Sequence, residues 1–277
     1  MKRFFVSFAV VLTMTTFSFG QKTDELLEEG KLLYRLEKAS WYGSDFFYEH
    51  FQHKREIVGG YLSYLNENNQ VINIFFEKDN PSRILVRFEF DSLPQTNPII
   101  IDTINTMATE QEIELITIRQ DAIQKISENK NRFFRFYENT SYNFIPLIRN
   151  EIKQVFILTS TQVPNIIIIG NDYLLTYNSE NNLIKREKLH KSILKFPGKS
   201  GNPENPIVST YHIHVLSELI TSTDICTLLL YKDFIEWKQH YVFGKKSVSV
   251  FDLEKEELIV STNKEWNKTN RFERNKQ

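Results

Sequence analysis

The spacing of apolar residues predicts a helix near the start of the chain, followed by strands. Within residues 24–40, leucines recur at helical spacing among Glu, Lys and Arg residues. From Gly59 onward the pattern is typical of strands, and turn signals separate three apolar runs, at 61–65, 71–76 and 83–90. This arrangement predicts an antiparallel meander. The aromatic-rich segment between them, residues 41–53, has an ambiguous pattern.

A second helix and a second group of strands follow the meander. Thr109 and Glu112 have the spacing of a capping box and precede isoleucines at helical spacing, which predicts a helix over about 109–130. Residues 222–238 have an amphipathic helical pattern. Further apolar runs predict strands at 155–158, 166–169, 173–177, 207–215, 247–252 and 258–262. The expected fold class is α+β, with an N-terminal helix, meander and helix, then a mixed sheet with flanking helices.

The first twenty residues have the pattern of a secretory signal peptide. Lys2 and Arg3 precede a largely apolar stretch, residues 4–17, and the small residues Ser18 and Gly20 indicate cleavage after Gly20. The apolar stretch is shorter than the roughly 20 residues that span a bilayer. We therefore expect Sec-dependent export to the periplasm or the cell exterior, and no membrane span after cleavage.

These patterns divide the chain into four parts. The signal peptide occupies residues 1–20, and an N-terminal α+β region occupies 21–143. A second domain is expected over 144–262, followed by a polar tail over 263–277. The boundary near residue 143 is placed after residues 132–142, where a new strand pattern begins.

Charge and cysteine content narrow the possible functions. The chain has 34 Lys and Arg residues against 35 Asp and Glu residues, a net charge of -1, so it lacks the basic surface of a nucleic-acid-binding protein. The single cysteine, Cys226, cannot form an intramolecular disulfide and excludes zinc sites built from several thiolates. Any metal would therefore be held by histidine and carboxylate. The sequence indicates no oligomeric state.

One group of residues has the pattern of a metal site. His212 and His214 are two residues apart on a predicted strand, so both side chains point to the same side, about 7 Å apart along the backbone. Asp224 follows in the first turn of a predicted helix that Thr221 would cap. Two histidines and one aspartate leave a fourth position for water, as in catalytic zinc sites. Two simpler interpretations stay open: Thr221 and Asp224 as an ordinary helix start, and the histidines as solvent-facing residues.

The order of these residues resembles the signature of the JAMM (MPN, or JAB-like) metalloproteases. That signature is His-x-His, then a hydroxyl residue, two spacers and an Asp that opens a helix. The resemblance covers roughly residues 145–262. Val215 stands where a proline often follows, Thr221 replaces the usual serine, and six residues separate His214 from Thr221. The whole chain also resembles a family of secreted bacterial proteins that has no assigned chemistry.

The resemblance implies a zinc-dependent hydrolase that cleaves peptide or isopeptide bonds in a peptide or protein substrate. His212, His214 and Asp224 would hold Zn²⁺, and Thr221 would stabilise the oxyanion. The family places a general base on a glutamate near the start of the domain. Glu151 is the candidate for that base, and the rivals are Glu187 and Glu204.

Two other classes of function remain open. One is a non-catalytic secreted binding protein with the same fold, and the other is a structural envelope protein without metal. The remaining histidines offer weaker candidates: His50 and His53 form a possible helical pair without a third ligand. His190 follows a basic stretch that we expect to be solvated, and His240 is expected to pack near Trp237.

Overall fold

The computed structural model describes the backbone of residues 7–202 and 204–274, and the side chains of residues 20–202 and 204–268. The predicted signal peptide lies partly outside these residues, and 7–19 are described only as helical backbone. Within the described residues, no helix is long and apolar enough to cross a membrane. The expected α+β class is confirmed, because an N-terminal helix precedes antiparallel and mixed sheets.

The N-terminal helix is longer than the leucine pattern predicted. Helix α1 runs from Ser7 to His50 and therefore includes most of the aromatic segment that was ambiguous in the sequence. The aromatic residues of this segment extend the helix because they pack on a sheet: the rings of Phe47 and Phe75 stack with centroids 4.1 Å apart. A short 3-10 helix, η1 (Gln52–Ile57), leads into the first sheet.

The predicted meander is confirmed and gains a fourth strand. Its order is β1-β2-β3-β4, with every pair antiparallel. The strands are β1 (Val58–Leu65), β2 (Val71–Glu77), β3 (Ile84–Phe90) and β4 (Ile100–Asp102). Helix α2 (Glu110–Glu128) begins with the predicted capping box of Thr109 and Glu112. The buried Glu112 carboxylate also accepts two hydrogen bonds of 2.7 Å from Arg87 of β3, which ties the helix to the sheet.

A second antiparallel sheet follows, in the order β5-β6-β8-β9. Its strands are β5 (Thr140–Arg149), β6 (Ile152–Thr161), β8 (Tyr173–Tyr177) and β9 (Leu183–Lys188). Beside it, β7 (Ile166–Gly170) pairs with β10 (Ile193–Pro197). The predicted strands at 155–158, 166–169 and 173–177 are confirmed, whereas β5, β9 and β10 had not been predicted. Between α2 and β5, Lys130–Arg132 form the 3-10 helix η2.

The third sheet is mixed, in the order β11-β12-β13-β14. Its strands are β11 (Ser209–Ile213), β12 (Gln239–Phe243), β13 (Ser247–Asp252) and β14 (Glu257–Thr262). Strand β11 runs parallel to β12, and α3 (Ser222–Tyr231) lies between them in the chain. The helix predicted over 222–238 therefore ends earlier than expected and is followed by η3 (Lys232–Phe234). The predicted polar tail forms helix α4 (Asn263–Arg274) within its described part.

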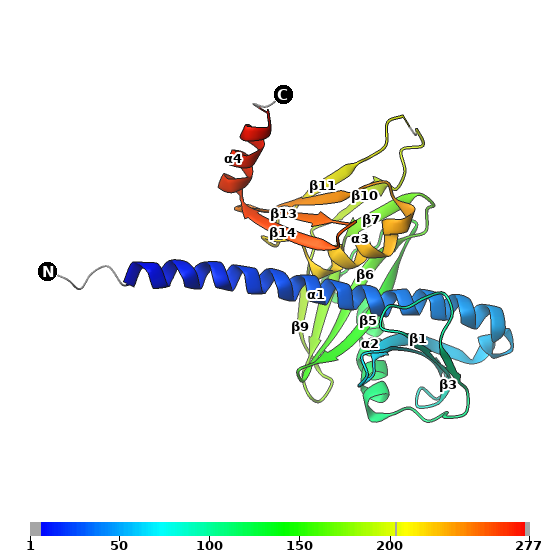
Figure 1. The fold of residues 1–277 in the computed structure, drawn as a ribbon. Helices are drawn as coiled ribbons and strands as arrows, with labels where there is room; N and C mark the ends of the chain where they lie inside the picture. The colour runs from blue at the N-terminus through cyan, green and yellow to red at the C-terminus, as the bar shows by residue number, and fades with distance from the viewer. Residues whose placement is uncertain (1–6, 203, 275–277) are drawn as a thin grey trace.

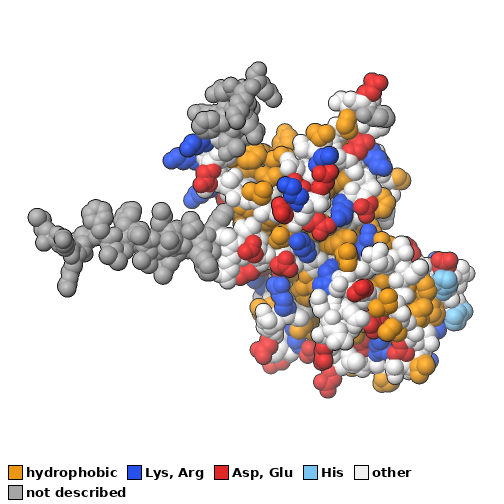
Figure 2. Space-filling view, in the orientation of Figure 1, with side chains coloured by type: hydrophobic (Ala, Val, Ile, Leu, Met, Phe, Trp, Pro, Cys, Tyr) orange, Lys and Arg blue, Asp and Glu red, His pale blue; other side chains and the backbone are white. Residues whose placement is uncertain are grey.

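Helix α1 crosses the molecule between the three sheets (Figure 1). One hydrophobic cluster contains residues from both sides of position 143, including Leu33 of α1, Phe75 of β2, Phe156 of β6 and Ile225 of α3. The two predicted regions thus share one core. On the face shown in Figure 2, basic and acidic side chains are interspersed, and hydrophobic side chains gather beside α4 over β13 and β14.

Helices α1 and α3 approach each other closely at Gly30. A Cβ atom at this position would lie 2.6 Å from the Cβ of Ile225 and 3.2 Å from the carbonyl oxygen of Ser222. Neither atom is at the end of a flexible side chain, so a larger residue requires the helices to separate. Since Ile225 follows Asp224 directly, this crossing also positions the start of α3.

Glu37 of α1 is buried near the second sheet. Its carboxylate accepts hydrogen bonds from Trp41 Nε1 (3.1 Å) and from Asn143 Nδ2 of β5 (2.6 Å). Burial raises the pKa of Glu37 to about 7, despite these hydrogen bonds and the nearby Arg119 guanidinium, which favour the carboxylate. Folding therefore takes up a proton at this residue near neutral pH.

We expect Gly30→Ala to lower the free energy of unfolding by roughly 1–2 kcal/mol, although alanine favours helix formation, because the added methyl group overpacks the α1–α3 crossing. Urea denaturation of both proteins would measure this change. Glu28→Ala, at an exposed position of the same helix, is the control and should change stability by less than about 0.5 kcal/mol. Equal stability of Gly30→Ala and the wild type would contradict the close approach.

We expect Glu37→Gln to change how stability depends on pH. The folded-state pKa of Glu37 lies above its unfolded value, so its contribution to stability is present at acid pH and is lost as the pH rises toward about 7. Between pH 4.5 and pH 8, the variant should gain about 3 kcal/mol relative to the wild type. Denaturant titrations across this range provide the measurement, and a constant difference between the two proteins would show the prediction to be wrong.

Candidate metal centre

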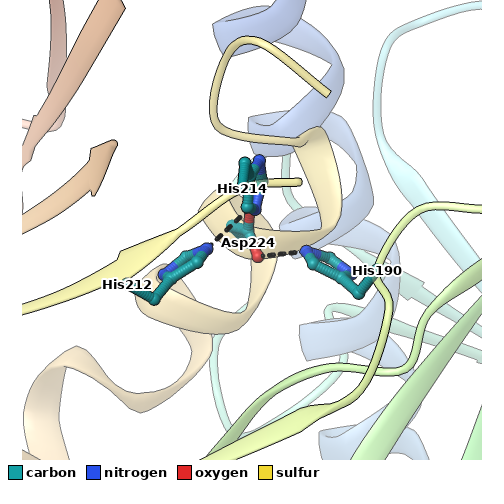
Figure 3. A group of neighbouring side chains, drawn as sticks. All are labelled: His190, His212, His214 and Asp224. Atoms are coloured by element: carbon teal, nitrogen blue, oxygen red, sulfur yellow. Dashed lines mark ion pairs between the residues drawn. The ribbon is translucent and has the colours of Figure 1, made fainter. Parts of the chain in front are cut away.

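Four buried side chains from three segments of the second half of the chain converge on one point (Figure 3). His212 lies on β11, and His214 directly follows the end of that strand. Asp224 is in the first turn of α3, and His190 follows β9. One donor atom from each residue lies within 4.8 Å of the others, so this group could hold a metal ion.

Strand alternation brings His212 and His214 to the same side. Both are 4% exposed, whereas Tyr211 and Ile213 on the opposite face are each 65% exposed. The backbone amide of His214 donates to the carbonyl oxygen of Phe243 (2.9 Å), which continues the β11–β12 pairing beyond the strand's end. The interpretation of these histidines as solvent-facing residues is therefore wrong, because the face of β11 that carries them is buried.

Asp224 belongs both to the N-terminal cap of α3 and to the cluster that could hold a metal. The Thr221 amide (2.9 Å) and hydroxyl (2.8 Å) donate to its Oδ2 atom, and the Asp224 amide donates back to Thr221 Oγ1 (3.2 Å). The same Oδ2 atom lies 3.3 Å from His214 Nε2 and 4.0 Å from His212 Nε2. Thr221 thus orients Asp224, and its hydroxyl is engaged in this cap rather than directed at the cluster.

The ring nitrogens that face the cluster are buried without hydrogen-bond partners. This is true of Nε2 in His190, His212 and His214, and of the Oδ1 atom of Asp224. His190 Nε2 and Asp224 Oδ1 are 2.9 Å apart, yet neither makes a well-aligned hydrogen bond. Buried polar atoms without partners are costly, and a cation among them would satisfy all four together.

The opposite nitrogens of His212 and His214 have hydrogen-bond partners, whereas that of His190 lies near a carboxylate without a hydrogen bond. His212 Nδ1 is 2.8 Å from His240 Nε2, and His214 Nδ1 is 2.7 Å from the carbonyl oxygen of Leu219. His190 Nδ1 lies 3.4 Å from Asp172 Oδ2. In His212 and His214, an acceptor at Nδ1 favours the neutral tautomer whose Nε2 lone pair points inward, which is the usual arrangement around metal-binding histidines.

The charges of the cluster follow from burial and from the two carboxylates. Burial lowers the pKa of His212 to about 4, so its ring is neutral near pH 7 and can offer a lone pair. Burial also disfavours the charged form of His190, but Asp224 and Asp172 outweigh it and raise the pKa to about 9. Burial would raise the pKa of Asp224, yet His190 and His214 hold it well below its ordinary value. Asp224 is therefore the anionic member of the group.

A cavity of about 160 Å³ adjoins the cluster. His190, His212 and His214 form part of its wall, and Ile169 and Leu194 are among the apolar residues that line it. Lys191 adds a positive charge to the lining. A metal held by the histidines would thus lie beside a small cavity that both polar and apolar residues line.

The structure does not bring Glu151 to the cluster. Glu151 is exposed in the turn between β5 and β6, where Asn150 and Glu151 both have positive φ, 51° and 63°. The cluster lies near the other end of β6, where the amide of Thr159 donates to Asp172 Oδ1 (2.9 Å). Thr159 lies seven positions along β6 from Ile152, a distance of about 23 Å.

The rival glutamates also lie elsewhere. Glu187 is on β9 and forms an ion pair with Lys185 (3.0 Å), and Glu204 is exposed in the loop before β11. Neither is among the residues that converge on the candidate site. His50 and His53 are exposed and do not join the cluster.

Sequence reasoning missed His190, which was expected on a solvated basic stretch. The charged residues belong to β9, which ends at Lys188, and the chain turns inward immediately afterwards: Leu189 donates its amide to the carbonyl oxygen of Asp172 (2.9 Å). His190 is consequently only 8% exposed. Sequence spacing could not find it, because it lies more than twenty residues from His212. His240 packs near Trp237 as expected, with ring centroids 6.1 Å apart, and also reaches His212.

Comparisons with known proteins identify no relative of this chain. No family model matches it, and no curated protein or solved structure is similar to it. The geometry of the site is therefore the basis for the functional argument.

Proposed function

We propose that this protein binds one Zn²⁺ ion through His190, His212, His214 and Asp224. The observation that carries the proposal is the convergence of four buried donor atoms that lack other partners, while the Nδ1 atoms of His212 and His214 are hydrogen-bonded on the outer side. Three imidazoles and one carboxylate match the ligand types and the coordination number that zinc prefers in proteins. The pattern of His212, His214, Thr221 and Asp224, which resembles the JAMM signature, supports the same assignment.

The donor set favours zinc over Mg²⁺, Ca²⁺ and Cu⁺. Mg²⁺ and Ca²⁺ prefer oxygen ligands, whereas three of the four donors here are nitrogens. Cu⁺ prefers sulfur, and the buried Cys226 is not a member of the cluster.

The first candidate role is a non-catalytic one. Four protein ligands fill a tetrahedral zinc site, which is the arrangement of structural rather than catalytic centres. An ion held by them would join the segment after β9, the end of β11 and the start of α3. We propose an exported zinc-binding protein in which the metal fastens the second and third sheets. The export rests on the signal-peptide pattern of residues 1–20.

The second candidate is a zinc-dependent hydrolase of the JAMM type, acting on a peptide or isopeptide bond. The cavity of about 160 Å³ favours it, because a substrate group could reach the histidines from there. A Zn²⁺ ion held at this site would polarise a carbonyl group and activate water. In this chain His190 would have to leave the ligand set to open a position, and Thr221 would continue to orient Asp224.

We expect the wild-type protein, purified from zinc-containing medium, to carry one Zn²⁺ per chain, and His190→Ala, His212→Ala and His214→Ala to lose it. Chelation of the metal should lower the thermal midpoint of the wild type, because the ion binds only the folded chain. Elemental analysis and calorimetry provide the measurements. His53→Ala is the matched control, since this exposed histidine should be replaceable without loss of metal. A wild type without stoichiometric zinc would refute the proposal.

A second experiment separates the two roles. Incubation of the zinc-loaded wild type with a mixed peptide library, followed by mass spectrometry, should show no cleavage if the four-ligand centre is structural. Cleavage that His212→Ala abolishes would establish the hydrolase instead. Glu151→Gln should leave both zinc content and any cleavage unchanged, because Glu151 lies at the far end of β6. Loss of cleavage in this variant would restore Glu151 as the general base.

A further inference from the structure

A histidine outside the ligand set lies within hydrogen-bond distance of one of its members. His240 of β12 is fully buried and lies beside β11, where it is the register partner of Thr210. Its Nε2 atom is 2.8 Å from His212 Nδ1, and its Nδ1 atom is 2.7 Å from Thr210 Oγ1. The three side chains therefore form one hydrogen-bonded row that ends at the candidate metal centre.

The row has one favourable arrangement of protons. A proton on His212 Nε2 would be buried without an acceptor, since the nearest carboxylate oxygen, Asp224 Oδ2, is 4.0 Å away. A proton on His212 Nδ1 can instead be donated to His240 Nε2. His240 then carries its own proton on Nδ1, and Thr210 Oγ1 accepts it. Every polar atom between Thr210 and the Nδ1 atom of His212 is satisfied in this arrangement.

We propose that His240, supported by Thr210, is a positioning residue that fixes the tautomer of His212 and directs its Nε2 lone pair into the cluster. This inference rests on the proposed zinc site but concerns a residue that is not a ligand. Outer hydrogen-bond partners of metal-binding histidines commonly change metal affinity by 10- to 100-fold when removed. His240 would have this effect without contacting the ion.

The alternative is that His240 only fills space. Its ring packs edge-on against Phe196 (centroids 5.8 Å apart) and stacks beside Trp237 (6.1 Å), so an aromatic residue is suited to the position in any case. The two roles make opposite predictions for two substitutions. Phenylalanine keeps the aromatic contacts but cannot accept the His212 proton, whereas glutamine can accept it but loses the ring.

The test is the zinc affinity of the full chain, measured by competition with a chromophoric chelator. If His240 positions His212, His240→Phe should bind Zn²⁺ 10- to 100-fold more weakly than the wild type, and His240→Gln should retain most of the affinity. Thr210→Val should cause a smaller loss of zinc affinity, because it removes the hydroxyl that accepts the His240 proton. Thr210→Ser keeps a hydroxyl and should retain the wild-type affinity. The reverse order, with Phe harmless and Gln harmful, would overturn the proposal in favour of packing.

Imidazole ¹⁵N spectra of the metal-free wild type provide a readout that does not need zinc. His212 should carry its proton on Nδ1, and so should His240. A proton on His212 Nε2 would overturn the inference even if zinc binds. If the wild type binds no zinc while both rings show the expected tautomers, the zinc proposal fails and the role of His240 stands. Urea denaturation of the metal-free variants checks that each one folds.

Discussion

The second half of this protein depends on burying three imidazoles and a carboxylate against one another. Such a group is unfavourable in a protein interior unless each polar atom has a partner. The fold supplies hydrogen-bond partners on the outer side. Asp224 is bonded within the α3 cap, His212 is bonded to His240, and His214 is bonded to the Leu219 carbonyl. On the inner side, the three Nε2 atoms and Asp224 Oδ1 have no hydrogen-bond partners. The group could therefore hold a cation.

The long first helix provides the frame for this arrangement. It contributes Leu33 and Phe47 to a hydrophobic core that includes residues of all three four-stranded sheets. At Gly30 it comes close enough to α3 to fix where that helix begins. Because Asp224 is in the first turn of α3, packing between two helices helps to position a candidate metal ligand whose other contacts are polar.

The site differs from the signature that it resembles in its fourth position. His190 joins the two histidines and the aspartate, whereas a catalytic zinc centre keeps its fourth position for water, and Glu151 lies in a turn far along β6. These two features favour a closed centre over a reactive one. The adjoining cavity is the feature that keeps hydrolysis as the second candidate, because it offers an approach to the same histidines.

The sequence by itself determined the local features: the α+β class, the meander, the Thr109 capping box, the helix start at Thr221 and the common side of His212 and His214. Each depends on residues within a few positions of one another, where helix and strand periods act directly. Only the tertiary structure decided that His190 and His240 join the site, and that charged segments such as β9 pair as strands. These features depend on contacts between distant residues, which local periodicity does not encode. Burial around a shared core is what brings them together.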